Sequence, residues 1–299
     1  MAAALIDGKA MAAAIKEEVR RDAGELLRTR GIVPGLAFIL VGDDPGSEVY
    51  VRSKGKACEE LHFRSATERR PATLSQGDLL ALIAALNADP SIHGVLVQLP
   101  LPRHIDEQRV IEAIDYRKDV DGFHPVNVGR LSLGLPCFRP CTPAGILEML
   151  ARSGNDPGGK HVVVVGRSNI VGKPVASMLV QKQKGANAAV TVVHTGVGDI
   201  APYVRQADIV VAAMGRPRAI TGAMLKAGAV VIDVGMNRIP DASTKSGTRL
   251  AGDVDFASAS DVASAITPVP GGVGLMTIAM LMRNTLLAAS GTLYTNSDI

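Results

Sequence analysis

The sequence predicts an α/β protein of two domains, and three observations lead to this expectation. Short, nearly continuous apolar segments alternate with segments of helical length, as in βαβ units built around a parallel sheet. One apolar segment, residues 162–165, runs into a turn at Gly166, as strands do in dinucleotide-binding domains. The length of 299 residues exceeds the usual size of one domain. We therefore expect an N-terminal α/β domain and a Rossmann-like domain, with a cleft between them.

The first half of the chain contains two repeats of the strand and helix pattern. Apolar runs closed by Pro, Gly or Asp predict buried strands, and the intervening segments predict helices. Ser47 precedes one such helix and has the side chain of an N-cap. The expected elements are a strand at 35–42, a helix at 47–61, a helix at 76–86 and a strand at 94–99.

A second series of the same units begins after Pro143. Its strands are almost wholly apolar, which is typical of a parallel sheet that is covered on both faces. We expect helices at 144–151 and 172–183, and strands at 161–165, 189–194, 209–213 and 229–234. The last helix, 275–289, has no strand after it, so we expect it to return to the first domain. The expected domains are therefore 1–143 plus 275–299, and 144–274.

Composition excludes several classes of function. The net charge is +3, and the 32 basic residues are interleaved with 29 acidic ones, which favours an anionic small molecule over nucleic acid. Three cysteines without zinc-type spacing make a disulfide framework or a structural metal unexpected. The N-terminus lacks the pattern of a secretory signal, and the apolar run at 273–282 is too short to span a bilayer. We expect a cytoplasmic protein without a membrane partner.

The turn after strand 161–165 reads Gly166-Arg167-Ser168 and continues to Gly172. A glycine turn into a helix offers backbone N–H groups and the positive end of a helix dipole to a phosphate. The spacing differs from the usual G-x-G-x-x-G pattern, and Pro174 excludes the Ser or Thr that a P-loop requires. A turn with only a packing role remains an alternative at this point.

The following strand bears on which dinucleotide would bind. NAD sites commonly carry an acid about 20 residues after the glycine turn, but strand 189–194 ends in Thr195-Gly196. No carboxylate there would repel a 2′-phosphate, and Arg167 could pair with one. The sequence therefore favours NADP over NAD.

One helix of the first domain carries three polar side chains on a single face. Ser47, Tyr50 and Lys54 are separated by three and four residues, which places them side by side. A phenol beside an amine in a partly dry site can orient the amine and favour its neutral form, so that the lysine can carry a proton. An amphipathic helix with a solvated lysine is the alternative.

Two other segments carry candidate binding residues. Gln98 ends a buried strand, and ligands bind at the carboxyl ends of parallel strands. Asp121 lies in an Asp-Val-Asp-Gly segment that could also be a simple turn. The loop containing Pro268, Gly271 and Gly272 combines stiff and flexible residues, which could let backbone approach a ligand or could serve as a hinge.

Six ordered stretches together resemble the bifunctional methylenetetrahydrofolate dehydrogenase/methenyltetrahydrofolate cyclohydrolase family, called FolD in bacteria. The resemblance covers nearly the whole chain. The stretches are SEVYVRSK at 47–54, GVLVQLPLP at 94–102, KDVDG at 118–122, VGRS at 165–168, DVGMN at 233–237 and TPVPGGVG at 267–274.

The resemblance implies an N-terminal catalytic domain that binds folate and a second domain that binds NADP. It implies that Lys54 transfers protons, Tyr50 stacks on the pterin, Gln98 holds Lys54 and Asp121 bonds the pterin ring. Further substrate contacts are implied for Ser47, Val97, Leu99, Pro268, Gly271 and Gly272. Cofactor contacts are implied for Gly166, Arg167, Ser168, Ile170, Thr195, Met236 and Gly272.

The implied reaction is oxidation of 5,10-methylenetetrahydrofolate with NADP, followed by hydrolysis of the methenyl product to 10-formyltetrahydrofolate. The resemblance also implies a homodimer in cytoplasmic one-carbon metabolism that serves purine biosynthesis. Two positions depart from the family pattern: Leu275 replaces a proline, and Gly196 replaces a basic residue. A dehydrogenase without cyclohydrolase activity and a nucleotide-sensing module are the alternative functions.

Overall fold

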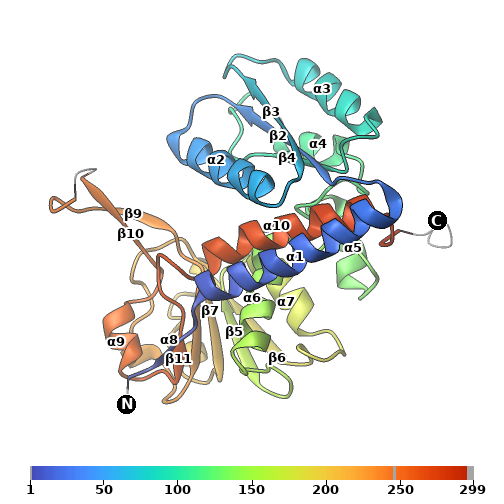
Figure 1. Ribbon diagram of the computed structural model, residues 1–299. Coiled ribbons are helices and arrows are strands. Elements are labelled where there is room, and N and C mark those ends of the chain that lie inside the picture. Colours follow the sequence, from blue (N-terminus) through green and yellow to red (C-terminus); the bar gives the residue numbers. More distant parts are fainter. Residues whose placement is uncertain (1, 245–246, 295–299) are drawn as a thin grey trace. The chain divides into compact units, whose positions relative to one another are not determined.

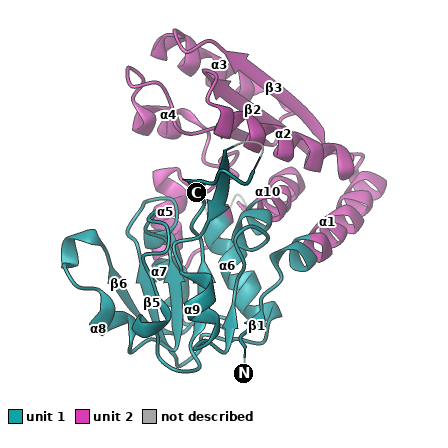
Figure 2. Ribbon diagram, turned by 90° about the vertical axis from the view of Figure 1, so that its left-hand side faces the viewer, with its two compact units in different colours: residues 1–12, 142–277 teal, residues 13–141, 278–299 magenta. Residues whose placement is uncertain are grey.

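The structure, a computed structural model, describes residues 2–244 and 247–294 (Figure 1). It divides into two compact units, which Figure 2 distinguishes by colour. Unit 1 comprises residues 1–12 and 142–277, and unit 2 comprises residues 13–141 and 278–299. Helices α1 (Gly8–Arg30) and α10 (Val273–Ser290) each contribute to both units. The chain thus enters unit 2 through α1, leaves it between Cys141 and Thr142, and enters it again through α10.

Unit 1 is built on a parallel sheet in the order β1-β11-β8-β7-β5-β6. Its strands are β1 (Ala4–Leu5), β5 (His161–Val165), β6 (Ala189–Val193), β7 (Ile209–Ala212), β8 (Val230–Asp233) and β11 (Ala265–Ile266). Its shorter elements are α6 (Cys141–Arg152), α7 (Gly172–Leu179), η1 (Thr195–Val197), α8 (Ala201–Val204), η2 (Gly222–Met224) and α9 (Phe256–Ser260). An antiparallel pair, β9 (Asn237–Pro240) and β10 (Thr248–Ala251), completes the unit.

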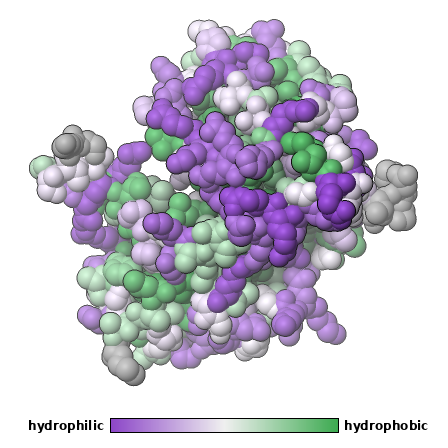
Figure 3. All heavy atoms as spheres, in the orientation of Figure 1, coloured by the Kyte–Doolittle hydropathy of each residue, from purple (hydrophilic) through white to green (hydrophobic). Residues whose placement is uncertain are grey.

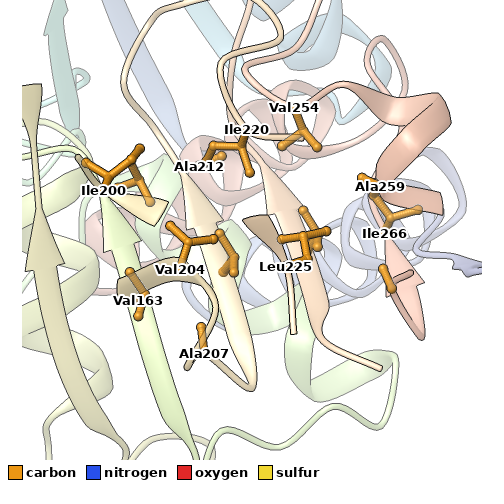
Figure 4. Close-up of a cluster of buried hydrophobic side chains, with 14 of the residues drawn as sticks. Val163, Ile200, Val204, Ala207, Ala212, Ile220, Leu225, Val254, Ala259 and Ile266 are labelled. Atoms are coloured by element: carbon orange, nitrogen blue, oxygen red, sulfur yellow. The ribbon is translucent and has the colours of Figure 1, made fainter. Parts of the chain in front are cut away.

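The central strands of unit 1 are apolar because both faces of the sheet are covered. Val163, Val210 and Val231 lie in one buried cluster with Ile220 and Ile266, several of whose side chains are drawn in Figure 4. Burial of one such side chain contributes about 1.5–3 kcal/mol relative to exposure. The N-terminal strand β1 pairs with β11, which explains why residues 1–12 belong to unit 1 although the sequence suggested the first domain.

Unit 2 contains a parallel sheet in the order β3-β2-β4. Its strands are β2 (Gly35–Val41), β3 (Arg64–Arg70) and β4 (Gly94–Val97), and its helices are α2 (Pro45–Glu60), α3 (Gln76–Ala88), α4 (Glu107–Ala113) and α5 (Pro125–Ser132). Every residue of β2 is buried, because alternate side chains such as Ala37 and Ile39 pack with Leu79 and Ile83 of α3 while the others face the opposite side.

Two expectations about helix ends are wrong. The N-cap of α2 is Asp44, whose carboxylate accepts from the backbone N–H of Ser47 at 2.7 Å, so Ser47 lies inside the helix. Proline at the first helical position lets the helix begin earlier than the sequence suggested. Helix α7 ends at Leu179, short of the expected residue 183, and a turn that includes a positive φ at Asn187 follows.

The two long helices differ in polarity. Ile15, Val19 and Leu26 of α1 are buried, whereas ion pairs such as Arg28–Glu25 lie on its outer side, and Figure 3 shows hydrophilic side chains along this helix. Helix α10 is apolar and, by length and composition alone, long enough to cross a membrane. Half of it is buried, and its Arg283 forms an ion pair with Glu18 at 2.8 Å. These are the features of a core helix.

Candidate functional site

The inward face of α2 supplies the lysine of the candidate site. Lys54 is only 7% exposed, and it lies on the same side of the helix as the buried Ser47 and Val51. Its Nζ donates a hydrogen bond to Gln98 Oε1 at 3.0 Å. A buried lysine without a partner would carry a large desolvation cost, so the solvated-lysine interpretation of the sequence is wrong.

Gln98 holds its side-chain oxygen toward Lys54 through a second contact. It follows β4 directly, and its Nε2 donates to the carbonyl oxygen of Leu99 at 2.8 Å. Ser47 Oγ donates to the same carbonyl at 3.4 Å. Because the amide nitrogen donates to Leu99, the amide is oriented with its oxygen, the only acceptor of the side chain, toward the amine of Lys54. The structure therefore brings together the residues that the sequence placed on a helix and at a strand end.

The acidic side chain of the candidate site is that of Asp121. Burial raises the pKa of its carboxyl, and the charge of Lys54 together with a hydrogen bond from Cys141 opposes this shift. Val97, Leu99 and Asp121 also line a cavity of about 20 Å³ in unit 2. Tyr50 is half-buried on α2, four residues before Lys54. A carboxyl and an amine that interact electrostatically, as Asp121 and Lys54 do, can bind a polar ring and exchange protons with it.

Three supporting residues were missed by sequence reasoning. Asn284 of α10 is buried, and its Nδ2 donates to the carbonyl oxygens of Val120 at 2.8 Å and Arg139 at 2.9 Å. Cys141 and Asp119 are also buried: the thiol of Cys141 donates to the carbonyl oxygen of Val120 at 3.4 Å, and Asp119 accepts from the backbone N–H of Gly122 at 3.2 Å. A polar Asn within the apolar run of α10 is the signal that could have identified one of them.

In unit 1, the glycine turn is fixed by close backbone packing. Gly166 has φ +143°, and a Cβ at this position would lie 2.1 Å from the carbonyl oxygen of Ala213. A Cβ on Gly172 would lie 2.2 Å from the carbonyl oxygen of Gly166. Ser168 Oγ accepts from the backbone N–H of Gly172 at 3.3 Å. The turn therefore leaves room only for backbone, as a close approach to phosphate requires.

The expected cofactor residues beyond the turn lie on the surface of unit 1. Arg167 and Thr195 are exposed, and Ile170 and Met236 are 43% exposed. The guanidinium Nη2 of Arg167 lies 3.9 Å from the position of a Cβ on Gly196. These side chains are available to a ligand, and Gly196 adds no second cation beside Arg167.

Two buried carboxylates hold the loops that follow β7 and β8. Asp233 accepts from the backbone N–H groups of Gly235 at 2.9 Å and Val254 at 3.0 Å. Asp253 accepts from those of Met214 at 2.7 Å and Gly215 at 2.9 Å. Sequence reasoning did not select either acid. Their contacts fix the backbone beside Met236, at the carboxyl ends of strands where a dinucleotide would bind.

The loop 267–272 also belongs to unit 1. Thr267 is buried, and its hydroxyl accepts from the backbone N–H of Asp233 at 2.7 Å. Gly271 has φ +106°, and a Cβ on Gly272 would lie 2.6 Å from the carbonyl oxygen of Pro268. The expected substrate residues therefore form two groups, one in each unit: Pro268, Gly271 and Gly272 in unit 1, and Ser47, Tyr50, Val97, Leu99 and Asp121 in unit 2.

Two protein-family models match the chain. The model described as tetrahydrofolate dehydrogenase/cyclohydrolase, catalytic domain, matches residues 6–121. The model described as tetrahydrofolate dehydrogenase/cyclohydrolase, NAD(P)-binding domain, matches residues 140–293. Together they cover most of the chain and both units.

Similar proteins and structures agree with these matches. The bifunctional protein FolD of Chlorobium phaeovibrioides is 57% identical, with 94% of this chain and 96% of that protein covered. The FolD crystal structure from Campylobacter jejuni is 48% identical, with a TM-score of 0.91 and coverage of 98% and 100%. The Trypanosoma brucei dehydrogenase-cyclohydrolase, solved with NADP and an inhibitor, is 42% identical, with a TM-score of 0.93 and coverage of 99% and 100%.

Proposed function

This chain belongs to the tetrahydrofolate dehydrogenase/cyclohydrolase family, and we propose from that premise how its residues divide the chemistry. The enzyme oxidises 5,10-methylenetetrahydrofolate to the methenyl form with NADP and hydrolyses that product to 10-formyltetrahydrofolate. We assign folate binding and proton transfer to the first expected domain, 1–143 plus 275–299. We assign NADP binding to the second, 144–274.

The observation that carries the proposal is the buried amine of Lys54, 3.0 Å from the oxygen of Gln98. Hydrolysis adds water to the methenyl carbon, opens the ring at one nitrogen and releases one proton. Lys54 takes one proton from the attacking water and delivers it to the departing nitrogen, and the second proton of the water is released from the carbinol hydroxyl as the formyl C=O forms. Gln98 keeps the amine directed at that carbon by accepting one of its hydrogens. One buried base therefore serves both halves of the hydrolysis.

Tyr50 and Asp121 hold the pterin in this scheme. The half-buried ring of Tyr50 offers an apolar face for stacking, one turn of α2 before Lys54. The carboxyl of Asp121 forms a hydrogen bond with the polar edge of the pterin. Ser47, Val97 and Leu99 complete the substrate contacts assigned to this domain. Pro268, Gly271 and Gly272 are the substrate contacts assigned to the second domain.

NADP, when bound, accepts the hydride in the oxidation. The residues of the chain that would hold it are Gly166, Arg167, Ser168, Ile170, Thr195, Met236 and Gly272. The tight turn at Gly166 admits a pyrophosphate against backbone N–H groups. Arg167 would pair with the 2′-phosphate through its exposed guanidinium.

We also propose that the enzyme is a homodimer in the cytoplasm and that it supplies one-carbon units to purine biosynthesis. Strand β6 is the last in the sheet order of unit 1, and Val192 on this strand is 40% exposed. Apolar side chains on an unprotected edge strand favour pairing with another chain. Light scattering should give the mass of a dimer, and Val192→Lys should give a monomer. A wild-type monomer would contradict the proposal.

The test of the proposed function is turnover. Purified protein is mixed with methylenetetrahydrofolate and either NADP or NAD, and the absorbance of the methenyl product and of the reduced cofactor is followed. We expect both signals with NADP, with the methenyl absorbance then decaying. A reduced-cofactor signal without that decay would mean that the protein is a dehydrogenase without cyclohydrolase activity. Cofactor binding without turnover would mean that it is a nucleotide-sensing module.

A further inference from the structure

A cluster of aromatic rings surrounds Tyr294 at the end of the described chain. The sequence contains only 4 Tyr, 5 Phe and no Trp. Tyr294 nevertheless contacts Tyr116 at 5.2 Å and Phe138 at 5.6 Å between ring centroids, both edge to face. The guanidinium of Arg130 lies 5.4 Å from the centroid of the Tyr294 ring. These contacts hold the phenol in a defined place in unit 2.

The hydroxyl of Tyr294 takes part in two hydrogen bonds. It donates to Asn127 Oδ1 and accepts from the backbone N–H of Phe138 at 3.3 Å. Burial raises the pKa of this phenol well above its ordinary value, so the hydroxyl keeps its proton and remains a donor at neutral pH. Tyr294 thereby satisfies the side-chain oxygen of Asn127, which is fully buried.

Asn127 transmits this contact to Asp119. Its Nδ2 donates to Asp119 Oδ2 at 2.8 Å and to the carbonyl oxygen of Tyr116 at 2.9 Å. Because the Asn127 oxygen accepts from Tyr294, the two hydrogens on Asn127 Nδ2 point toward Asp119 and the carbonyl of Tyr116. Loss of the phenol would leave a buried acceptor unpaired and free the amide to turn.

Asp119 in turn holds the backbone on both sides of Asp121. Its side chain is 2% exposed, and it accepts from the backbone N–H of Gly122 at 3.2 Å and of His124 at 2.7 Å. The segment 119–124 is thus tied to one carboxylate. Through Asn127, the carboxylate of Asp119 is connected by hydrogen bonds to the hydroxyl of Tyr294.

We propose that Tyr294 is a positioning residue for the folate site, acting through Asn127 and Asp119 on the segment that carries Asp121. The inference rests on the role proposed above for Asp121. Tyr294 lies just outside the family match, which ends at residue 293. A tether that only secured the end of the chain would contribute to thermal stability without selecting between the two substrates.

The test compares Michaelis constants for the two substrates. Phenylalanine retains the ring contacts, so Tyr294→Phe removes only the hydroxyl. We expect the KM for methylenetetrahydrofolate to rise about two- to tenfold, the loss of one net hydrogen bond, with the KM for NADP unchanged. Tyr203→Phe is the matched control, because Tyr203 is an exposed tyrosine of α8 in unit 1, and it should leave both constants unchanged.

A double variant separates this inference from the proposed function. If Tyr294 acts through Asp121, Tyr294→Phe combined with Asp121→Asn should raise the folate KM no more than Asp121→Asn alone. Three results would overturn the positioning role while leaving the role of Asp121 in place. They are a double-variant folate KM equal to the product of the two single effects, an equal rise in the KM for NADP in Tyr294→Phe, and an unchanged folate KM in Tyr294→Phe. An unchanged folate KM in Asp121→Asn would overturn the proposed role of Asp121, and this inference with it.

Discussion

The amine of Lys54 donates a hydrogen bond to the side-chain oxygen of Gln98 at 3.0 Å, across 44 residues of sequence. One residue comes from a helix and the other from a strand end, and each is oriented by its own element. The amide nitrogen of Gln98 is bound to the carbonyl of Leu99, which prevents the amide from presenting a donor to the amine. The proton transfer proposed for this lysine would therefore depend on a glutamine that does not itself titrate.

Replacement of Lys54 should separate the two activities from cofactor binding. Lys54→Met keeps the length and apolar stem of the side chain but removes the base, so hydrolysis of methenyltetrahydrofolate should fall by at least about 100-fold. NADP binding, measured by titration calorimetry, should be unchanged. Lys56→Met, at an exposed position of the same helix, is the control and should hydrolyse normally. Normal hydrolysis by Lys54→Met would refute the assignment.

Replacement of Gln98 by an acid should shift the pH dependence of hydrolysis. In Gln98→Glu a carboxylate would stand 3.0 Å from the amine and favour its charged form. The pH at which the hydrolysis rate reaches half its maximum should therefore move upward by roughly one unit or more. Rates measured across pH 6 to pH 10 would check this. An unshifted profile with a lower plateau would mean that Gln98 acts only in packing.

The turn at Gly166 should not tolerate a side chain. In Gly166→Ala the new Cβ would meet the carbonyl oxygen of Ala213 at 2.1 Å, and φ is +143°. We expect a loss of about 2 kcal/mol or more in unfolding free energy and a weakened affinity for NADP. Gly24→Ala is the control, because a Cβ there meets nothing within 4 Å and alanine favours a helix. It should match or exceed the wild type in urea denaturation.

Removal of Arg167 should reduce the discrimination between the two dinucleotides. The KM for NADP should rise about 10-fold in Arg167→Ala, whereas the KM for NAD, which lacks the 2′-phosphate, should stay constant. Gly196→Arg should lower the KM for NADP, since its side chain would begin 3.9 Å from the Arg167 guanidinium and add a second cation. Equal changes for both dinucleotides would place Arg167 away from the 2′-phosphate.

The buried carboxyl of Asp233 should make stability depend on pH. Burial raises its pKa from 3.8 to about 6. The folded protein therefore binds this proton more tightly than the unfolded chain, so the resulting stabilisation is present below pH 3.8 and is lost as the pH rises to about 6. The difference in unfolding free energy between wild type and Asp233→Asn should fall across that interval and remain constant above it. Urea denaturation at several pH values measures it, and a constant difference would contradict the shift.

Much of the fold could be predicted because local patterns determine it. The apolar runs of β2, β5 and β7 stand where the sequence predicted strands, since their side chains must be buried on both faces. Helix α1 and strands β1 and β3 were not predicted. Among the predicted elements, errors lie at helix ends, where one residue decides. Asp44 rather than Ser47 caps α2, because proline at the first turn allowed an earlier start.

Most of the candidate site could be identified, but its supporting residues could not. Lys54, Gln98 and Asp121 were selected because they lie in motifs or at strand ends. Asn284 and Tyr294 belong to no such motif, and their partners Val120 and Asn127 lie 164 and 167 residues away in the sequence. Asp253 also lies outside the motifs. Asp233 begins the DVGMN stretch, but its role is recognised only from the N–H groups that surround its buried carboxyl.

The sequence by itself determined the alternating elements, the glycine turn and the order of the motifs, because each depends on residues close together in the chain. The tertiary structure decided which side chains meet. Burial of Lys54 against Gln98, the tie between Asp119 and Asn127, and the place of Tyr294 all arise from packing between distant segments. A buried polar group must find its partner wherever the fold supplies one, and that partner is not written next to it.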